Sequence, residues 1–372
     1  MQKAPDFTKS KQSPLEWIVS NVGRVLISLF VPLVTFLVLW QGFIFLRESQ
    51  APKIVITVVA IVWGVGGAAL LYFVANWLIE KLPDEWRKRL MPFVFVGPAM
   101  AILFWFLLLP TIRTLYLSFF NNNSTEFVGL ENYIAIFTER NMFESYRNNL
   151  LWIIFGTTGS VSFGLLIAVL ADRSSFENFA KSLIFLPMAI SFVGAGVIWR
   201  FMYYYRPEGQ VQTGLLNAIV TGLGGQPQAW TTLLQPWNNF FLIFIMVWLQ
   251  TGYAMVIFSS AIKGVPEEIL EAARVDGANE FQIFFRIIIP SIQGTIITVT
   301  TTIVIFALKI FDIVIVMTGG QYGTEVIATQ FYRQFFSNRN FGYGSAIAIL
   351  LLVAVIPIMI YNLKQFGERE AF

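Results

Sequence analysis

The segment Gly264–Pro290 reads GVPEEILEAARVDGANEFQIFFRIIIP and separates two long apolar runs with a series of charged residues. Pro266 is suited to the first position of a helix, where the N–H that proline lacks would have no partner anyway. Glu267 and Glu268 follow in the first turn, where the helix dipole favours carboxylates. Gly277 is placed to end this helix in the left-handed conformation. A charged helical element in a hydrophobic chain indicates a surface offered to a soluble partner.

A second short helix is expected from Ala278 to Arg286, and Pro290 marks the entry to the next apolar run. Residues expected to share a face are Ile269, Ala272 and Ala273 on the first helix and Phe281, Phe284 and Phe285 on the second. The spacing predicts a helix–turn–helix lying under a membrane. The simpler alternative is an ordinary amphipathic loop at the membrane interface.

The composition of the chain is typical of an integral membrane protein. Of the 372 residues, 56% are hydrophobic and only 13% are charged, whereas about one-quarter of a soluble domain is charged. The net charge of +3 and the absence of a basic tract do not indicate nucleic-acid binding. Without Cys or His, the chain has no disulfide, thiolate or imidazole metal site, and no Ser-His-Asp triad. It also lacks a phosphate-binding loop, so composition and motifs do not favour an enzyme.

The hydrocarbon core of a bilayer is about 30 Å thick, which a helix of about 20 apolar residues crosses. Runs of this kind occur at Val25–Leu46, Ile54–Ile79, Leu90–Ile112, Leu151–Ala171, Ser182–Trp199, Phe240–Ile262, Ile287–Met317 and Gly344–Tyr361. The sequence therefore predicts an all-α integral membrane protein with about eight transmembrane helices. The first run is too long for the apolar core of a signal peptide and is expected to be a retained span.

The distribution of Lys and Arg predicts the orientation of these spans. The loops on the side of the two termini hold more Lys and Arg than the opposite loops, so the positive-inside rule places both termini and Gly264–Pro290 in the cytoplasm. Two long polar loops, roughly Leu117–Asn149 and Arg200–Asn238, then lie outside. FVGLENYIAIF, at 127–137, predicts a short amphipathic helix in the first of them. These loops are either simple connections or a docking surface for an extracellular partner.

The charged segment resembles the EAA loop of ATP-binding-cassette (ABC) importer permeases. The matching residues are Glu271, Ala272, Ala273, Asp276 and Gly277, with a closing Pro290. The resemblance extends from about Leu90 to Tyr361 through Phe127–Tyr133, Ile184–Pro187, Trp248–Met255, Lys309–Gly320 and Gly342–Ala348. It is to the carbohydrate-uptake type, and the added N-terminal spans are similar to those of the longer, maltose-permease-like subunit. The expected domains are 1–89, a tail with two extra helices, and 90–372, a six-helix type I permease core whose coupling loop is 264–290.

The resemblance also implies partners and a place in the cell. The EAA residues Glu271, Ala272, Ala273, Asp276 and Gly277 would couple the chain to a separate ATPase dimer, on which ATP and Mg²⁺ are bound. No cofactor is expected in this chain. The other expected partners are a second permease subunit, forming a heterodimer, an extracytoplasmic solute-binding protein and the lipid bilayer. The expected location is the cytoplasmic (inner) membrane of a bacterium.

Candidate solute contacts lie in the sixth and seventh runs. Tyr253 matches a tyrosine that contacts sugar in the maltose permease, and Gln250 lies one turn away on the same helix face. Helix–helix hydrogen bonding is the simpler explanation for Gln250. Thr302 either faces the solute or bonds its own backbone. Lys309 and Asp312 are costly inside a membrane, so they are expected either to pair on one helix face or to line the path.

The resemblance implies an ATP-driven importer of a sugar or sugar-like solute, an α-glucoside such as trehalose, sucrose, maltose or glucosylglycerol. Ile303, Ala307 and Ile310 replace polar positions of the maltose permease, which argues against maltose itself. A glycerol-phosphate or polyol permease of the same family is an alternative. An ion-coupled secondary transporter should show intramembrane acids and broken helices, and an intramembrane enzyme is the remaining rival.

Overall fold

The computed structural model describes residues 22–82, 84–172, 174–232 and 236–370. Helices make up most of these residues, and the only strand-like pairing among them is an isolated bridge between Phe120 and Phe127. The structure therefore confirms the all-α fold.

Six helices of the described residues are long and apolar enough to cross a membrane: Phe30–Glu48, Lys53–Glu80, Asp84–Leu117, Arg140–Asp172, Asn238–Lys263 and Phe341–Lys364. Two further pairs meet that test only together, because each is bent. Glu177–Ala189 and Phe192–Met202 meet at 101°, and Glu280–Ser291 and Gln293–Leu308 meet at 71°. If each pair is one span, the number is eight, as predicted.

The chain divides into two compact units, Met1–Thr111 and Ile112–Phe372. The first unit contains α2 (Val22–Glu48), α3 (Lys53–Glu80), α4 (Asp84–Leu103) and the π-helical turn η1 (Phe104–Leu108), and the division falls within α5 (Leu109–Leu117). Trp63 on α3 donates a hydrogen bond to the carbonyl of Leu39 on α2, at 3.0 Å. The domain boundary predicted at 89–90 stays a prediction.

The second unit contains the remaining elements. They are α6 (Glu131–Thr138), α7 (Arg140–Leu151), η2 (Trp152–Gly156), α8 (Thr157–Asp172), α9 (Glu177–Phe185), η3 (Leu186–Ala189), α10 (Phe192–Met202), α11 (Leu215–Gly222), α12 (Asn238–Lys263), α13 (Glu267–Val275), α14 (Glu280–Ile283), η4 (Phe284–Ile288), α15 (Ile289–Ser291), α16 (Gln293–Leu308), α17 (Asp312–Met317), α18 (Ile327–Tyr332), η5 (Arg333–Ser337) and α19 (Phe341–Glu370). The helix α6 confirms the short helix expected at 127–137. In contrast, α7 occupies part of the segment that the sequence assigned to a loop.

Helix α12 is the centre of the second unit and packs along α8. The contact is close at Gly164 on α8, where an added Cβ would lie only 2.4 Å from the Cβ of Ala254. Small residues of this kind let two membrane helices approach closely. Large side chains of α12, among them Leu242, Met246 and Phe258, are fully buried around this contact.

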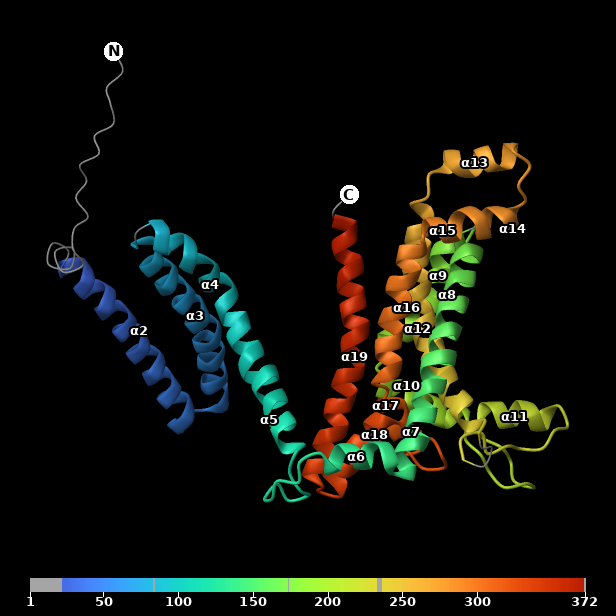
Figure 1. Ribbon diagram of the computed structural model, residues 1–372. Helices are drawn as coiled ribbons and strands as arrows, with labels where there is room; N and C mark the ends of the chain where they lie inside the picture. The colour runs from blue at the N-terminus through green and yellow to red at the C-terminus, as the bar shows by residue number, and fades with distance from the viewer. Residues whose placement is uncertain (1–21, 83, 173, 233–235, 371–372) are drawn as a thin grey trace, which may run out of the picture. The chain divides into compact units, whose positions relative to one another are not determined.

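The second unit has two distinct ends (Figure 1). The helices α13 and α14 and the C-terminal end of α19 lie at one end, here called the α13 end. The helices α6, α7 and α11 lie at the other, here called the α11 end. This arrangement agrees with a topology in which 264–290 and the C-terminus share one side of the membrane. Which side that is stays a prediction.

Two predicted spans are not the single straight helices that the sequence suggested. The run Ser182–Trp199 breaks after the η3 turn, which contains Pro187, and α10 restarts with Ser191 accepting a hydrogen bond from the Gly194 N–H at 3.0 Å. The run Ile287–Met317 bends at Ile292 and its helix ends at Leu308. Broken helices are tolerated within a membrane where other protein groups satisfy the freed backbone.

A side chain from another helix meets that need at Leu308. Asn149 on α7 is buried, and its Nδ2 donates to the Leu308 carbonyl at 2.9 Å. Its Oδ1 accepts from the N–H of Ile327, the first residue of α18, at 2.8 Å. One amide therefore satisfies the end of one helix and the start of another.

Candidate coupling surface and solute path

The helix α13 carries the acidic first turn that the sequence predicts, since it begins at Glu267 and Glu268. Pro266 is not the first helical residue as predicted but the N-cap, with φ −57° and ψ 131°. The extended ψ of Pro266 explains the difference, because an N-cap residue lies outside the helical region.

Gly277 ends α13 as predicted. Its φ is +83°, and its N–H donates to the Arg274 carbonyl at 3.1 Å. The N–H of Ala278 donates to the Ala273 carbonyl at 2.9 Å. These two bonds form a Schellman motif, in which the residue after the helix adopts the left-handed conformation. The turn between the two helices is therefore fixed by the backbone.

The second helix begins two residues later than predicted, at Glu280. Asn279 and Gln282 form a capping box, each side chain accepting from the other residue's N–H at 2.8 Å. This reciprocal capping explains where the helix starts. An ion pair of 3.1 Å between Arg274 and Glu280 then joins the two helices across the turn.

The two helices have an inner and an outer face. The inner face packs on a buried cluster of Ile283, Ile288 and Ile292, and it includes Leu270, Ala273 and Ala278. The outer face exposes Glu271 and Ala272, together with Ile269, Val275, Phe281 and Phe285. Ala273, which the spacing places on one helix face with Ile269 and Ala272, is partly buried against this cluster, whereas Ile269 and Ala272 are exposed. The outer face is an exposed apolar surface edged by acids, and we call it the coupling face.

A network of charged residues that the sequence analysis did not predict joins α8, α9 and α12. Lys181 on α9 contacts Asp172 on α8, Glu177 on the same helix α9, and Ser259 on α12. Lys263, the last residue of α12, contacts Glu177 at 2.5 Å. Lys181 and Asp172 are mostly buried. The network lies at the α13 end. In the sequence, these charged residues lie just outside apolar runs. Ordinary loop charges are also common there, so the sequence does not distinguish the network from them.

The candidate solute residues lie in the middle of the second unit. Gln250 on α12 is 6% exposed, and Tyr253 is partly buried against the core around α12. A cavity of about 350 Å³ is lined on α12 by Val247, Trp248 and Thr251, and neither Gln250 nor Tyr253 lines it. Thr302 on α16 donates to the Thr298 carbonyl at 2.8 Å, a bond to its own helix backbone. A role of Gln250, Tyr253 and Thr302 in solute binding stays a prediction.

Lys309 and Asp312 do not lie on one helix face. The helix α16 ends at Leu308 and α17 begins at Asp312, so the predicted pairing along a continuous helix is wrong. Lys309 is exposed, with its Nζ 5.5 Å from the centre of the Phe306 ring. Asp312 lies in the first turn of α17, where the helix dipole favours a carboxylate. The break leaves Lys309 accessible, and a role of Lys309 and Asp312 in lining the solute path stays a prediction.

Buried asparagines at the α11 end hold the segment between α17 and α18. Asn148 Nδ2 donates to the carbonyls of Gly323 and Glu325 at 2.9 and 2.7 Å. Asn238 Nδ2 donates to the Tyr322 carbonyl at 2.7 Å, and Asn239 Nδ2 to Gly323 at 3.2 Å. The sequence analysis did not identify these residues. The signal was two Asn-Asn pairs, each beside an apolar run.

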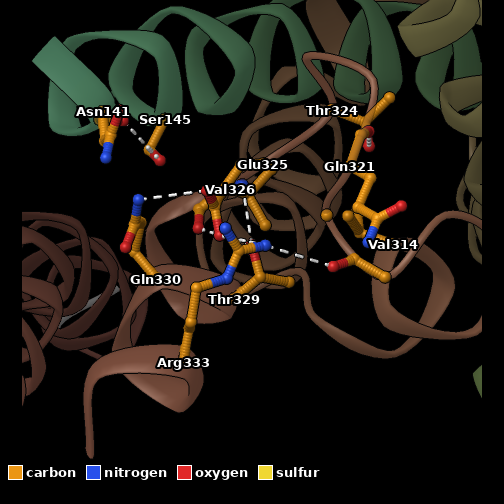
Figure 2. A network of polar contacts seen from close by, with 12 residues as sticks. Asn141, Ser145, Val314, Gln321, Thr324, Glu325, Val326, Thr329, Gln330 and Arg333 are labelled. Carbon is orange, nitrogen blue, oxygen red and sulfur yellow. Dashed lines mark hydrogen bonds and ion pairs between the residues drawn. The ribbon is translucent and has the colours of Figure 1, made fainter. Parts of the chain in front are cut away.

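Glu325 is a buried carboxyl in this segment (Figure 2), with 7% of its surface exposed. Its Oε2 accepts from Gln330 Nε2 at 3.0 Å, and its Oε1 lies 3.0 Å from a guanidinium nitrogen of Arg333. Burial raises the pKa of Glu325 to about 7, although Arg333 lowers it, and Glu144 raises it further. The segment is thus held by charge as well as by asparagine amides.

Comparison with known proteins places this architecture in a family. Residues 160–366 match the family described as binding-protein-dependent transport system inner membrane component. The osmoprotective compounds uptake permease protein GgtC of Synechocystis sp. is 56% identical over 277 residues, which cover 74% of this chain and 99% of GgtC. The alpha-glucoside transport system permease protein AglF of Rhizobium meliloti is 50% identical over 285 residues, or 76% of this chain and 84% of AglF.

A solved structure supports the fold. A chain of a bacterial ABC transporter involved in the import of the acidic polysaccharide alginate aligns with a TM-score of 0.65 at 20% identity. The alignment covers 76% of this chain and 96% of that chain. The helical architecture, the family match over 160–366 and the identity to these permeases agree. The chain belongs to the family of inner membrane components of binding-protein-dependent transport systems.

Proposed function

We propose that this chain is one permease subunit of an ATP-driven importer for a neutral glucoside or a glucosylated compatible solute. The observation that carries the proposal is the coupling face, an exposed apolar and acidic surface held rigidly at one end of a membrane permease. In this proposal the α13 end is cytoplasmic, as are both termini, and the membrane is the bacterial cytoplasmic membrane. A separate ATPase dimer docks on the coupling face and binds the ATP and Mg²⁺.

The coupling face has the rigidity that such docking needs. Its turn is fixed by the Schellman motif at Gly277 and by the Arg274–Glu280 ion pair. Glu271 and Ala272 are exposed for contact with the ATPase, whereas Ala273 packs inward and supports the helix from below. Asp276 is the C-cap residue of α13. Of the five predicted coupling residues, we therefore assign contact to the first two and positioning to the other three.

Movement of the coupling face passes to the spans through its inner side. The Ile283, Ile288 and Ile292 cluster packs against residues of α8, α12 and α16, among them Leu165, Ile262 and Ile296. The bends at 101° and 71° divide two spans into segments that are able to move separately. Alternating access then follows: closure of the ATPase dimer pulls α13 and α14, and the spans around the solute path tilt with them.

The proposed solute class rests on the relatives and on the path. Two of the similar permeases are named for osmoprotective compounds and for alpha-glucosides. Tyr253 offers an aromatic ring, and Gln250 an amide, which together suit the apolar and hydroxyl faces of a sugar. Ile303, Ala307 and Ile310 are buried and apolar, which disfavours a solute that needs many polar contacts from the segment 303–310. A second permease subunit would supply the opposite wall of the path, and a solute-binding protein would deliver the solute from outside.

Reconstitution tests this proposal. The chain is co-expressed with its second permease and its ATPase and placed in liposomes with ATP inside and solute-loaded binding protein outside. We expect uptake of a labelled glucoside or glucosylglycerol that requires both ATP and binding protein. Replacing Tyr253 with Ala should lower uptake while leaving assembly and basal ATPase activity unchanged. Uptake that persists without the ATPase would instead establish a secondary transporter, and preference for glycerol phosphate would establish the polyol alternative.

A further inference from the structure

A polar cavity of about 490 Å³ lies near α11, and the candidate residues Gln250 and Tyr253 are not among the residues that line it. It is formed by the end of α10, the segment that follows it and the end of α17. Its polar lining includes Arg200, Tyr204, Tyr205, Thr231, Thr232 and Gln321. Small-molecule sites typically have volumes of about 300–1,000 Å³, so the cavity has room for a mono- or disaccharide.

One wall of the cavity is held in place by a buried asparagine. Asn217 on α11 is fully buried, and its Nδ2 donates to the carbonyls of Tyr204 and Gln228 at 3.1 and 2.9 Å. Its Oδ1 accepts from the Gln228 N–H at 2.9 Å. This amide therefore holds together two parts of the chain that line the cavity: the part before α11, with Tyr204 and Tyr205, and the part after α11, with Thr231.

The opposite wall is the segment that the Glu325 network holds (Figure 2). Thr318 and Thr324 share a hydrogen bond of 2.6 Å, and Arg333 donates to the Gly319 carbonyl at 3.3 Å. The carbonyl of Tyr322 accepts from Asn238. Both walls are thus held in place by hydrogen bonds to other parts of the chain. Most of the polar side chains that line the cavity are therefore available to contact a ligand.

The lining has the chemistry of a sugar site. Within the described residues, the side chains of Arg200, Tyr205, Thr231, Thr232 and Gln321 make no hydrogen bond to the rest of the chain. Tyrosine rings present aromatic faces, and hydroxyl, amide and guanidinium groups present donors and acceptors. The lining contains no Asp or Glu, so it does not favour a cation. We propose that this cavity is an outer receiving site for a neutral polyhydroxylated solute, occupied before the solute enters the membrane path. The proposal rests on the proposed function, which it extends by a second solute site.

Photoaffinity labelling tests the receiving site. The assembled importer is placed in nanodiscs without binding protein and irradiated with a diazirine-bearing α-glucoside, and the labelled peptides are identified by mass spectrometry. We expect labelling at 200–206 and 317–322 that an excess of unmodified glucoside abolishes. Tyr205→Ala and Thr231→Val each remove a side-chain group that lines the cavity, so labelling should require several-fold more probe. Tyr361→Ala removes an exposed tyrosine of α19 and serves as the matched control.

Each outcome of this experiment is decisive. Competed labelling of the cavity that falls in both cavity variants and not in Tyr361→Ala supports the receiving site. Labelling confined to residues outside the cavity, no labelling because a partner subunit fills the cavity, or labelling unaffected by both variants overturns it. ATP-driven uptake is measured on the same wild-type preparation, so failure of the receiving site with uptake intact leaves the proposed function standing, whereas absence of uptake contradicts the proposed function.

Discussion

Replacing Gly277 with Ala should uncouple ATP hydrolysis from transport. Gly277 has φ +83°, and an added Cβ at this position would meet no atom within 4 Å. The substitution therefore creates no clash and acts only through the backbone. A left-handed conformation costs a residue with a Cβ about 1–2 kcal/mol, which shifts the population of an ordered turn by a factor of about 5–30. The Schellman motif that fixes α13 against α14 would then open for part of the time.

The chain offers a matched control for this substitution. Gly224 has the same φ of +83° and equally open surroundings, but it lies near α11 rather than in the coupling loop. Gly224→Ala therefore imposes the same backbone strain at the other end of the unit. Gly277→Asn provides a second control, because Asn tolerates the left-handed region better than Ala and should restore much of the coupling.

The assay compares ATPase activity and uptake in the same proteoliposomes. We expect Gly277→Ala to lower uptake per ATP hydrolysed or to weaken retention of the ATPase during purification, with Gly224→Ala close to the wild type. The reasoning is refuted if Gly277→Ala transports with unchanged coupling, or if both glycine variants lose coupling equally. The second result would mean that general instability, not the coupling loop, causes the defect.

Three further predictions concern the buried polar groups. Asn149→Ala leaves the Leu308 carbonyl and the Ile327 N–H unsatisfied, at a cost of about 1–3 kcal/mol for each, so thermal unfolding followed by tryptophan fluorescence should occur at lower temperature. In the folded protein the pKa of Glu325 is about 7, above its ordinary 4.5. Its contribution to the free energy of unfolding is therefore complete below pH 4.5 and is lost as the pH rises to about 7. Glu325→Gln should remove that part of the pH dependence of unfolding. Lys181→Met leaves Asp172 and Glu177 without their shared cation. Because the site is partly solvated, the free energy of unfolding should fall by about 2 kcal/mol, which is less than the cost of breaking a fully buried pair. Unchanged thermal stability would contradict the structural role of the network.

The sequence predicts the features of this fold that depend on local properties. Long apolar runs locate the spans, because crossing a membrane needs a fixed length of helix. The end of α13 is predicted from Gly277, because the left-handed position favours glycine regardless of distant contacts. The short helix α6 is likewise local. The structure has a helix at each of these places, although the span predicted to begin at Leu151 begins at Arg140.

The features that the sequence does not reveal depend on distant partners. The end of α16 at Leu308 depends on Asn149, which is 159 positions away in the chain, while the residues around Leu308 are apolar and continue the helical pattern. The pairing of Lys309 with Asp312 was inferred from that apparent continuity and failed with it. In the coupling loop, the inward direction of Ala273 depends on packing against the Ile283 cluster. Spacing alone groups Ala273 with Ile269 and Ala272 and does not show which of the three packs on that cluster.

Site-specific cross-linking tests the central claim most directly, because the chain contains no cysteine that would interfere. A single cysteine is introduced at Ala272, which is exposed on the coupling face, or at Tyr204, which is exposed at the α11 end. Each assembled complex is treated with a short bifunctional reagent. The account predicts that Ala272→Cys cross-links to the ATPase subunit, with a yield that changes on ATP binding, and that Tyr204→Cys does not. The absence of any ATPase cross-link from Ala272→Cys, or an ATPase cross-link from Tyr204→Cys, would contradict it.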